Sequence, residues 1–578
     1  MSKESDFIKD VKDNYREAVD GWSEIYTAAA DDTRFVYDVD GGQWPESERN
    51  KRVNDGRPVI TSNKLQKTLR RIRGDGMMNR PSLKVIPVDS AADVNMAQLY
   101  SGILREIEYL SSADIIYDTA YNHTLSASIG FWRIITQYTD ENSFEQDIRL
   151  KRVINPASVH FDPYAQEFNL EDAKYCFVED LIRQDKFKKD YPKAESQDFD
   201  SSSTATLFGD WMQQDKVRVA EYFYKDTKSQ KLVLLEDGQV IPIEGKVTID
   251  ALKHMAERGS PKIIRERTAY IDVVKWCKLS GAEVLEESIW PGKGIPVIPM
   301  LGDEVVVDGK RYYLSLARGA KGPQEMYNYW ASAATETVAL SPKMPFIVDH
   351  RQVKGFEREW DEANIHNRMY IRYKAIAGLQ KPSRENQAQI PTAIMNMMQS
   401  MAYDIEDHLG QYESSKGEAS NERSRVAIMA RVQQSDKGTY LFVNNRTRSM
   451  ICGGRQIIDL IPKIYDTQRA VQILGEDGSH ELVKVNKPIL AEDGVTPIKE
   501  NDLSVGKYDL IASIGASFAS LREETTRTME TAMQYAGPEI ATILTPLLFK
   551  YSDAPGAKEL SEEISSAVKQ MQAQAQPK

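Results

Sequence analysis

Apolar residues near the start of the chain recur at spacings of three and four, the pattern of helices that bury one face. The clearest run is Phe7–Ala30, whose apolar positions are Phe7, Val11, Tyr15, Val19, Trp22 and Tyr26. The same spacing predicts helices over Asn63–Gly74, Ala91–Leu110 and Ala113–Ser126. A stretch rich in Gly, Asp and Asn, Asp38–Arg57, predicts a loop after the first helix. The N-terminal part of the chain is therefore expected to be helical.

From Ile129 to about Ile298 the pattern changes to short runs rich in Val, Ile, Tyr and Phe, which indicate strands separated by turns. The predicted strands are Phe131–Tyr138, Asp147–Ile154, Lys174–Asp180, Val217–Tyr224, Lys231–Leu235 and Ile271–Lys278. A hairpin is predicted over Val305–Arg311, turning at Asp308 and Gly309. These strands do not alternate with helices, so there is no βαβ rhythm. The predicted fold class is α+β, mainly helical.

Two charge-poor helical stretches, Lys321–Leu340 and Pro391–Leu409, lie on either side of an insert with many basic residues. Each stretch is roughly 18 residues, or about 27 Å of α-helix. The insert is Ser341–Ile390. Its candidates for binding DNA or a partner protein are Lys343, Arg351, Lys354, Arg358, Arg368 and Arg372. A lone helical hairpin leaves faces exposed that neighbouring subunits would cover. The segment therefore predicts a ring built of many copies.

Apolar residues of the second stretch follow helical spacing at Ile394, Met398, Met401, Ile405 and Leu409, and Met395 and Met397 broaden the stripe. One interpretation is an ordinary core stripe. The other is an interface between subunits that can repack, since methionine is adaptable. On the first stretch, Tyr327, Tyr329 and Trp330 are candidate anchors between subunits, a role that aromatic residues often take.

The part of the chain after the hairpin returns to a helical period over Asn421–Tyr465. Gly438 and the pair Gly453–Gly454 interrupt it, and propensity alone would split this segment into two or three helices. The remaining predicted elements are a hairpin over Ala470–Val485 with its turn at Glu476–Gly478, a strand over Tyr508–Ile514 and a helix over Leu521–Tyr535.

The composition is that of an ordinary soluble protein of several domains. The chain has 578 residues, 41% hydrophobic and 28% charged, which favours two to four domains. No run of eighteen apolar residues and no signal-peptide core is present, so no membrane contact is expected. The three cysteines are scattered and predict free thiols in a reducing compartment. A net charge of −12 argues against a general nucleic-acid-binding protein.

The sequence lacks the common catalytic and metal-binding motifs. The string from Gly302 to Arg311 is too long for a P-loop and lacks its hydroxyl residue. The loop Asp38–Gly42 fails the EF-hand template, because glycine occupies a ligand position. No GxSxG or HExxH motif occurs. We therefore expect no enzymatic activity, no metal and no cofactor.

Several runs of the sequence resemble the portal proteins of short-tailed, double-stranded DNA bacteriophages, the group similar to the phage P22 portal. The stretches that carry the resemblance are Arg57–Leu65, Tyr117–Tyr138, Arg152–Phe177, Gly292–Asn328 and Asp459–Gly478. Their order along the chain is more specific than any one of them.

The resemblance implies a dodecameric ring with a central channel for double-stranded DNA at one capsid vertex. The domains it implies are an N-terminal helical and α+β wing (1–317), a first stem helix (318–340), a clip (341–385), a second stem helix (386–412), a long helix bracing the wing (413–469) and a hairpin and helical crown (470–578). No C-terminal barrel is expected, because only a short helix follows Pro555.

The resemblance also implies partners: the terminase large subunit, a head–tail adaptor, the major capsid protein and scaffolding proteins. The protein would be made in the host cytoplasm and located in the virion. Sequence-independent passage of DNA is expected, because no base-reading element is visible. Another head–tail connector protein is the main alternative. A packaging enzyme, such as a terminase or nuclease, is a further one that the missing P-loop disfavours.

Overall fold

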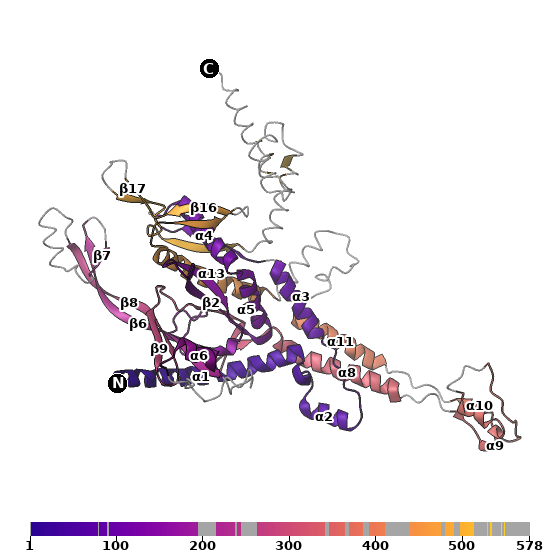
Figure 1. Ribbon diagram of the computed structural model, residues 1–578. Helices are drawn as coiled ribbons and strands as arrows, with labels where there is room; N and C mark the ends of the chain where they lie inside the picture. Colours follow the sequence, from indigo (N-terminus) through magenta and orange to yellow (C-terminus); the bar gives the residue numbers. More distant parts are fainter. Residues whose placement is uncertain are drawn as a thin grey trace. The chain divides into compact units, whose positions relative to one another are not determined.

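The computed structural model describes residues 2–78, 80–89, 92–194, 216–236, 240–243, 263–340, 346–363, 369–384, 392–410, 439–475, 480–490 and 497–513, with a few isolated positions beyond (Figure 1). The chain divides into two compact units. The first unit comprises Met1–Ala30, Arg71–Ser315 and Tyr440–Lys578. The second comprises Asp31–Arg70 and Leu316–Thr439.

Most of the helices predicted for the N-terminal part are confirmed. The helices up to residue 190 are α1 (Ser2–Tyr37), α2 (Glu46–Asn54), α3 (Lys64–Met78), α4 (Val94–Leu110), α5 (Ala113–Ala127) and α6 (Gln184–Asp190). The apolar stripe of α1 is buried as its spacing predicts, with Tyr15 and Tyr26 almost inaccessible to solvent. Helix α2 corrects the predicted loop over Asp38–Arg57. Its one apolar residue, Val53, is exposed, so no periodic pattern marks this helix.

The largest sheet of the first unit has six antiparallel strands in the order β4-β5-β6-β8-β9, with β7 paired to the far part of β6. Its strands are β4 (Val159–Phe161), β5 (Tyr175–Arg183), β6 (Lys216–Leu235), β7 (Val240–Ile243), β8 (Ile263–Leu279) and β9 (Val284–Ile289). The two strands predicted at Val217–Tyr224 and Lys231–Leu235 are one continuous strand. The polar run between them pairs with β8 throughout, and this long-range pairing overrides the local turn signal.

Smaller β elements complete the first unit. They are β1 (Ser82–Pro87), β2 (Ile129–Tyr138), β3 (Gln146–Arg152), β10 (Val297–Leu301), β11 (Asp303–Val307), β12 (Lys310–Leu314), β15 (Arg469–Leu474), β16 (His480–Val485), β17 (Lys487–Leu490), β18 (Pro497–Glu500) and β19 (Tyr508–Ser513). The predicted hairpin at Asp308 and Gly309 is confirmed as β11–β12, with positive φ at both turn residues. Strand β1 pairs with β19 from the other end of the chain.

Helix α13 (Tyr440–Ile464) lies in the core of the first unit and contacts β10, β19, β3 and α4. It runs without a break through Gly453 and Gly454, so the division that propensity alone predicts does not occur there. A Cβ at Gly453 would lie 2.0 Å from Trp132, and one at Gly454 would lie 2.4 Å from Leu510. The two glycines therefore allow the helix to approach β2 and β19 closely, and packing compensates for their low propensity.

Some predictions fall outside the described residues. These are the part of the predicted helix between residues 421 and 438, the turn at Glu476–Gly478, nearly all of the helix over Leu521–Tyr535 and the expected absence of a barrel.

Candidate functional site: a helical hairpin and its insert

The candidate site lies in the second unit and is built on two helices, α8 (Lys321–Leu340) and α11 (Thr392–His408), which pack along each other (Figure 1). The bounds of α8 are those predicted, and the bounds of α11 differ from the prediction by one residue at each end. Helix α8 follows a short 3₁₀ turn, η4 (Arg318–Ala320). Arg318 and Lys321 both pair with the buried Asp32, at 2.9 and 2.7 Å, and fix the start of the helix.

The predicted apolar stripe of α11 is its less exposed face. Ile405 and Leu409 are fully buried within the subunit, and Ile394, Met398 and Met401 are half-buried. The other apolar side chains of α11 are exposed: Met395 at 50%, Met397 at 47% and Tyr403 at 60%. The stripe therefore belongs to the packing of the hairpin itself, and a second apolar surface remains uncovered on α11.

Polar residues along one side of α8 hold a segment of the same unit, Arg57–Leu65, which is irregular up to Asn63 and enters α3 at Lys64. Gln324, Asn328, Ser332 and Glu336 succeed one another at intervals of four residues, so they form a row along the helix. The first three are completely buried. We refer to these four residues as the α8 ladder.

The α8 ladder satisfies backbone groups of the segment one after another. Its bonds are Lys64 N–H and Leu65 N–H to Gln324 Oε1 (both 3.0 Å), Gln324 Nε2 to Ser62 O (3.0 Å), Ser62 N–H to Asn328 Oδ1 (3.0 Å), Ile60 N–H to Ser332 Oγ (2.9 Å) and Arg57 to both oxygens of Glu336 (2.9 and 3.1 Å). Four helical residues rise about 6 Å and two extended residues span about 6.6 Å, so the two repeats match over several turns. The segment runs antiparallel to α8.

A buried arginine fixes α2 beside this ladder. Arg52 is inaccessible to solvent, and its guanidinium lies 4.7 Å from the ring centre of Tyr329 and 5.5 Å from that of Trp44. It also lies within ion-pair distance of Glu336 (3.7 Å). Cation–π contacts and a carboxylate compensate part of the cost of burying the charge. Arg52 explains how a helix without an apolar face is held.

The aromatic candidates of α8 are partly engaged within their own subunit. Tyr327 is half-buried and lies 5.5 Å from the Lys64 ammonium. Trp330 is half-buried and meets Tyr329 edge to face at 5.5 Å. Exposed apolar residues of α8 lie elsewhere, at Met326 (43%) and Val338 (55%).

The insert contains β13 (Phe346–Ile347), α9 (His350–Val353), α10 (Glu357–Asp361) and β14 (Ser383–Arg384), which pairs with β13. Of its six candidate residues, Lys343 and Arg368 lie outside the described residues. Three of the others pair with a carboxylate: Arg351 with Asp349 (2.8 Å), Arg358 with Glu362 (2.9 Å) and Arg372 with Glu359 (2.9 Å). Lys354 is exposed and forms no ion pair with the part of the insert that the structure describes.

The basic residues of the insert alone did not predict its acidic partners. Asp349, Glu359 and Glu362 are visible there, and Glu362 stands four residues after Arg358, a spacing that predicts a helical ion pair. Glu359 could not be assigned to Arg372, because that pair closes a loop of thirteen residues. Three of the four described candidate cations of the insert are thus balanced locally.

Asp349 gives a test of this local balance. It accepts a bond from Arg351 N–H as the N-cap of α9 and pairs with the guanidinium of the same residue. The Arg351 side chain, with the backbone bond, lowers the pKa of Asp349 from 3.8 to about 2. Because the pKa is lower in the folded state, the ionised Asp349 carboxylate stabilises the fold. This stabilisation is fully present above the ordinary pKa of 3.8 and is lost as the pH falls toward 2. In Arg351→Gln we expect the pKa of Asp349, measured by NMR titration, to return toward 3.8, whereas Arg358→Gln should leave it unchanged.

No group of three or more His, Cys, Asp or Glu that could hold a metal occurs among the residues that the structure describes. Within the same residues, no helix is long and apolar enough to cross a membrane.

Comparison with known proteins relates the chain to phage portal proteins. The chain is similar to a portal protein of Acyrthosiphon pisum secondary endosymbiont phage 1, which is 23% identical over 569 residues, covering 92% of this chain and 76% of the relative. More particularly, the family model of the phage P22-like portal protein matches residues 12–578, so the chain belongs to that family. The predicted resemblance is confirmed. Portal proteins are a structural class and components of the phage capsid.

Proposed function

We propose that twelve copies of this chain form a ring at one capsid vertex, through which double-stranded DNA is packaged and ejected. The single observation that carries the proposal is the match to the portal family over nearly the whole chain. In this proposal α8 and α11 are the stem helices around the channel, and the insert is the clip. Each copy carries a net charge of −12. An acidic wall retains DNA weakly, because few phosphates would exchange their counterions for protein cations.

The proposed contacts between neighbouring stems use the exposed apolar side chains of the hairpin. Met395, Met397 and Tyr403 on α11 are about half exposed, and Met326 and Val338 on α8 are exposed in the same way. A heterologous contact, in which different faces meet, forms a ring when the rotation between neighbouring copies closes. Of the candidates named from the sequence, Trp330, Ile394, Met398 and Met401 retain enough exposure to border such a contact, whereas Ile405 is a core residue of its own subunit.

The proposed role of the clip is to dock proteins, namely the terminase large subunit during packaging and the head–tail adaptor afterwards. Arg351, Arg358 and Arg372 already have carboxylate partners, so each would have to give up an ion pair to bind a phosphate. The described part of the insert also exposes Met369 and Tyr370, at 103% and 77%. Exposed apolar and aromatic side chains suit a protein interface better than a DNA backbone.

Electron microscopy of the purified full-length protein tests the proposed ring. We expect class averages with twelvefold symmetry and an open central channel. Met397→Asp should shift the population from rings to single subunits, because it places a charge in a proposed apolar contact. Gln399→Asp, at an exposed polar position on the same helix, is the matched control and should still form rings.

Particles that are closed at the centre, or rings unaffected by Met397→Asp, would contradict this arrangement. A filter-binding assay at low salt completes the test. Two unrelated duplexes of equal length should bind within about twofold of each other, since phosphate contacts carry no sequence information.

A further inference from the structure

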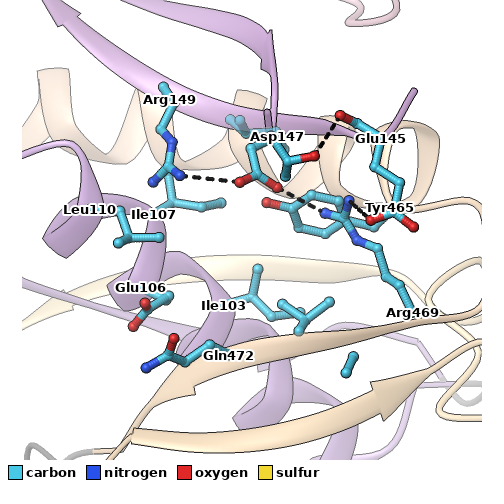
Figure 2. A pocket seen from close by; sticks show the side chains of 14 residues that line it. Ile103, Glu106, Ile107, Leu110, Glu145, Asp147, Arg149, Tyr465, Arg469 and Gln472 are labelled. Carbon is cyan, nitrogen blue, oxygen red and sulfur yellow. Dashed lines mark hydrogen bonds and ion pairs between the residues drawn. The ribbon is translucent and has the colours of Figure 1, made fainter. Parts of the chain in front are cut away.

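A cavity of about 210 Å³ lies in the first unit between α4, the β2–β3 hairpin, the end of α13 and β15 (Figure 2). Its charged lining residues are Glu106, Glu145, Asp147, Arg149 and Arg469. Ligand pockets for drug-sized molecules are larger, on the order of 300–1,000 Å³. The cavity therefore suits one side chain or an equally small molecule.

On one wall of the cavity the charges neutralise one another. Asp147 pairs with Arg149 at 3.1 Å and with Arg469 at 3.3 Å, and Arg469 lies 3.9 Å from Glu145. The Arg469 guanidinium also stacks 3.7 Å from the ring centre of Tyr465 (Figure 2). This wall is held in place by its own ion pairs.

The carboxylate on the other wall has fewer partners. Glu106, on α4, is 4% exposed, and among the residues that the structure describes neither of its oxygens has a hydrogen-bond partner. Its recorded counter-charge is His480 Nδ1 at 3.3 Å, on a residue that is half-exposed and packed against Tyr109. Buried polar groups in native proteins are nearly always paired, and an unpaired one calls for a specific cause.

Aliphatic side chains lie between the two walls. The cavity is lined by Ile103, Ile107, Leu110, Ile148 and Val471 in addition to the charged residues. A ligand must therefore carry positive charge to meet Glu106 and must present hydrocarbon to the rest of the surface. Lysine and arginine side chains combine these two features, because their stems are apolar and their heads are charged.

We propose that this cavity binds a cationic aliphatic chain, with its ammonium or guanidinium group on the Glu106 carboxylate and its stem against Ile103 and Ile107. Two sources have this chemistry: a lysine or arginine side chain from a second copy of the protein, and a free alkylamine. A small anion is disfavoured as a ligand, because it would meet the buried Glu106 carboxylate.

Titration calorimetry of the full-length protein at pH 8 tests this site. The probes are n-butylammonium and n-propylguanidinium, which reproduce the lysine and arginine side chains, and n-butanol as the neutral analogue. We expect both cations to bind at least tenfold more tightly than n-butanol. Glu106→Gln should weaken cation binding at least tenfold, about 1.4 kcal/mol. Glu481→Gln, at an exposed acid on β16, is the matched control and should change binding less than twofold.

Equal binding of n-butanol and the cations, or cation binding unchanged in Glu106→Gln, would overturn the proposal. A structure of the wild-type protein with n-butylammonium gives a second measurement that does not depend on how the variant folds. The nitrogen of n-butylammonium should lie about 3 Å from a Glu106 oxygen. A nitrogen placed elsewhere would also overturn the proposal.

Comparing cation binding by single subunits with cation binding by rings distinguishes the two sources. This comparison rests on the proposed ring. Cation binding to single subunits but not to rings assigns the cavity to a side chain of a second copy. Binding to both assigns it to a free alkylamine. If no rings form, the proposed function fails, while the binding to single subunits is still measured.

Discussion

Replacing Gln324 by leucine is expected to lower the free energy of unfolding by about 3–5 kcal/mol, because one buried amide serves four backbone and side-chain groups. Its oxygen accepts from Lys64 N–H and Leu65 N–H. Its nitrogen donates to Ser62 O and to Asn328 Oδ1. Leucine has a similar size but no polar atom. All four groups would lose a partner at a site with no solvent exposure.

Native-state hydrogen exchange measures this effect where it arises. The amides of Lys64 and Leu65 should exchange faster in Gln324→Leu than in the wild type by the factor that corresponds to the lost stability, roughly a hundredfold or more. Gln399→Leu makes the same chemical change at an exposed position of α11 and should leave these amides protected. If the protection of Lys64 and Leu65 were the same in both variants, the α8 ladder would not be what holds the segment.

Local patterns predicted the elements of this protein well wherever one face of an element is buried. The stripe of α1 and the hairpin at Asp308–Gly309 needed only spacing and turn chemistry. The same reasoning failed for α2, because Arg52, a charged residue, provides its buried contact. It failed for β6 as well, where a polar run continues a strand that pairs with β8.

The candidate site was predictable as a segment but not as a set of contacts. The bounds of α8 and α11 were predicted from two charge-poor helical stretches. The polar row Gln324, Asn328, Ser332 and Glu336 was present in the sequence at a visible spacing, yet nothing local says what it binds. Its partner, Arg57–Leu65, lies about 270 residues away along the chain. Hydrogen bonds of this separation are set by the fold and cannot be deduced from the neighbours of a residue.

Gly453→Ala is expected to destabilise the first unit by at least about 3 kcal/mol, more than overpacking usually costs. The new Cβ would lie 2.0 Å from Cη2 and 2.4 Å from Cζ2 of Trp132. Trp132 cannot withdraw easily. It is fully buried, it donates a hydrogen bond from Nε1 to Ser449 Oγ (3.0 Å), and it meets Tyr117 edge to face at 5.0 Å. Helix α13 would have to move away from β2 instead, and its contacts with β10 and β3 would be strained.

A double-mutant cycle separates this clash from the ordinary effect of alanine in a helix. Trp132→Phe removes the outer ring atoms that the new methyl group would strike, so Gly453→Ala should cost less in that background than in the wild type. Gly74→Ala is the matched control in α3, where a Cβ meets nothing within 4 Å. There alanine should stabilise by about 0.5–1 kcal/mol, because glycine has more backbone freedom to lose. Thermal unfolding followed by near-ultraviolet circular dichroism reports both changes. An equal cost of Gly453→Ala with and without Trp132 would place the strain in the helix backbone, whereas a reduced cost shows that glycine is required by the indole packed against α13.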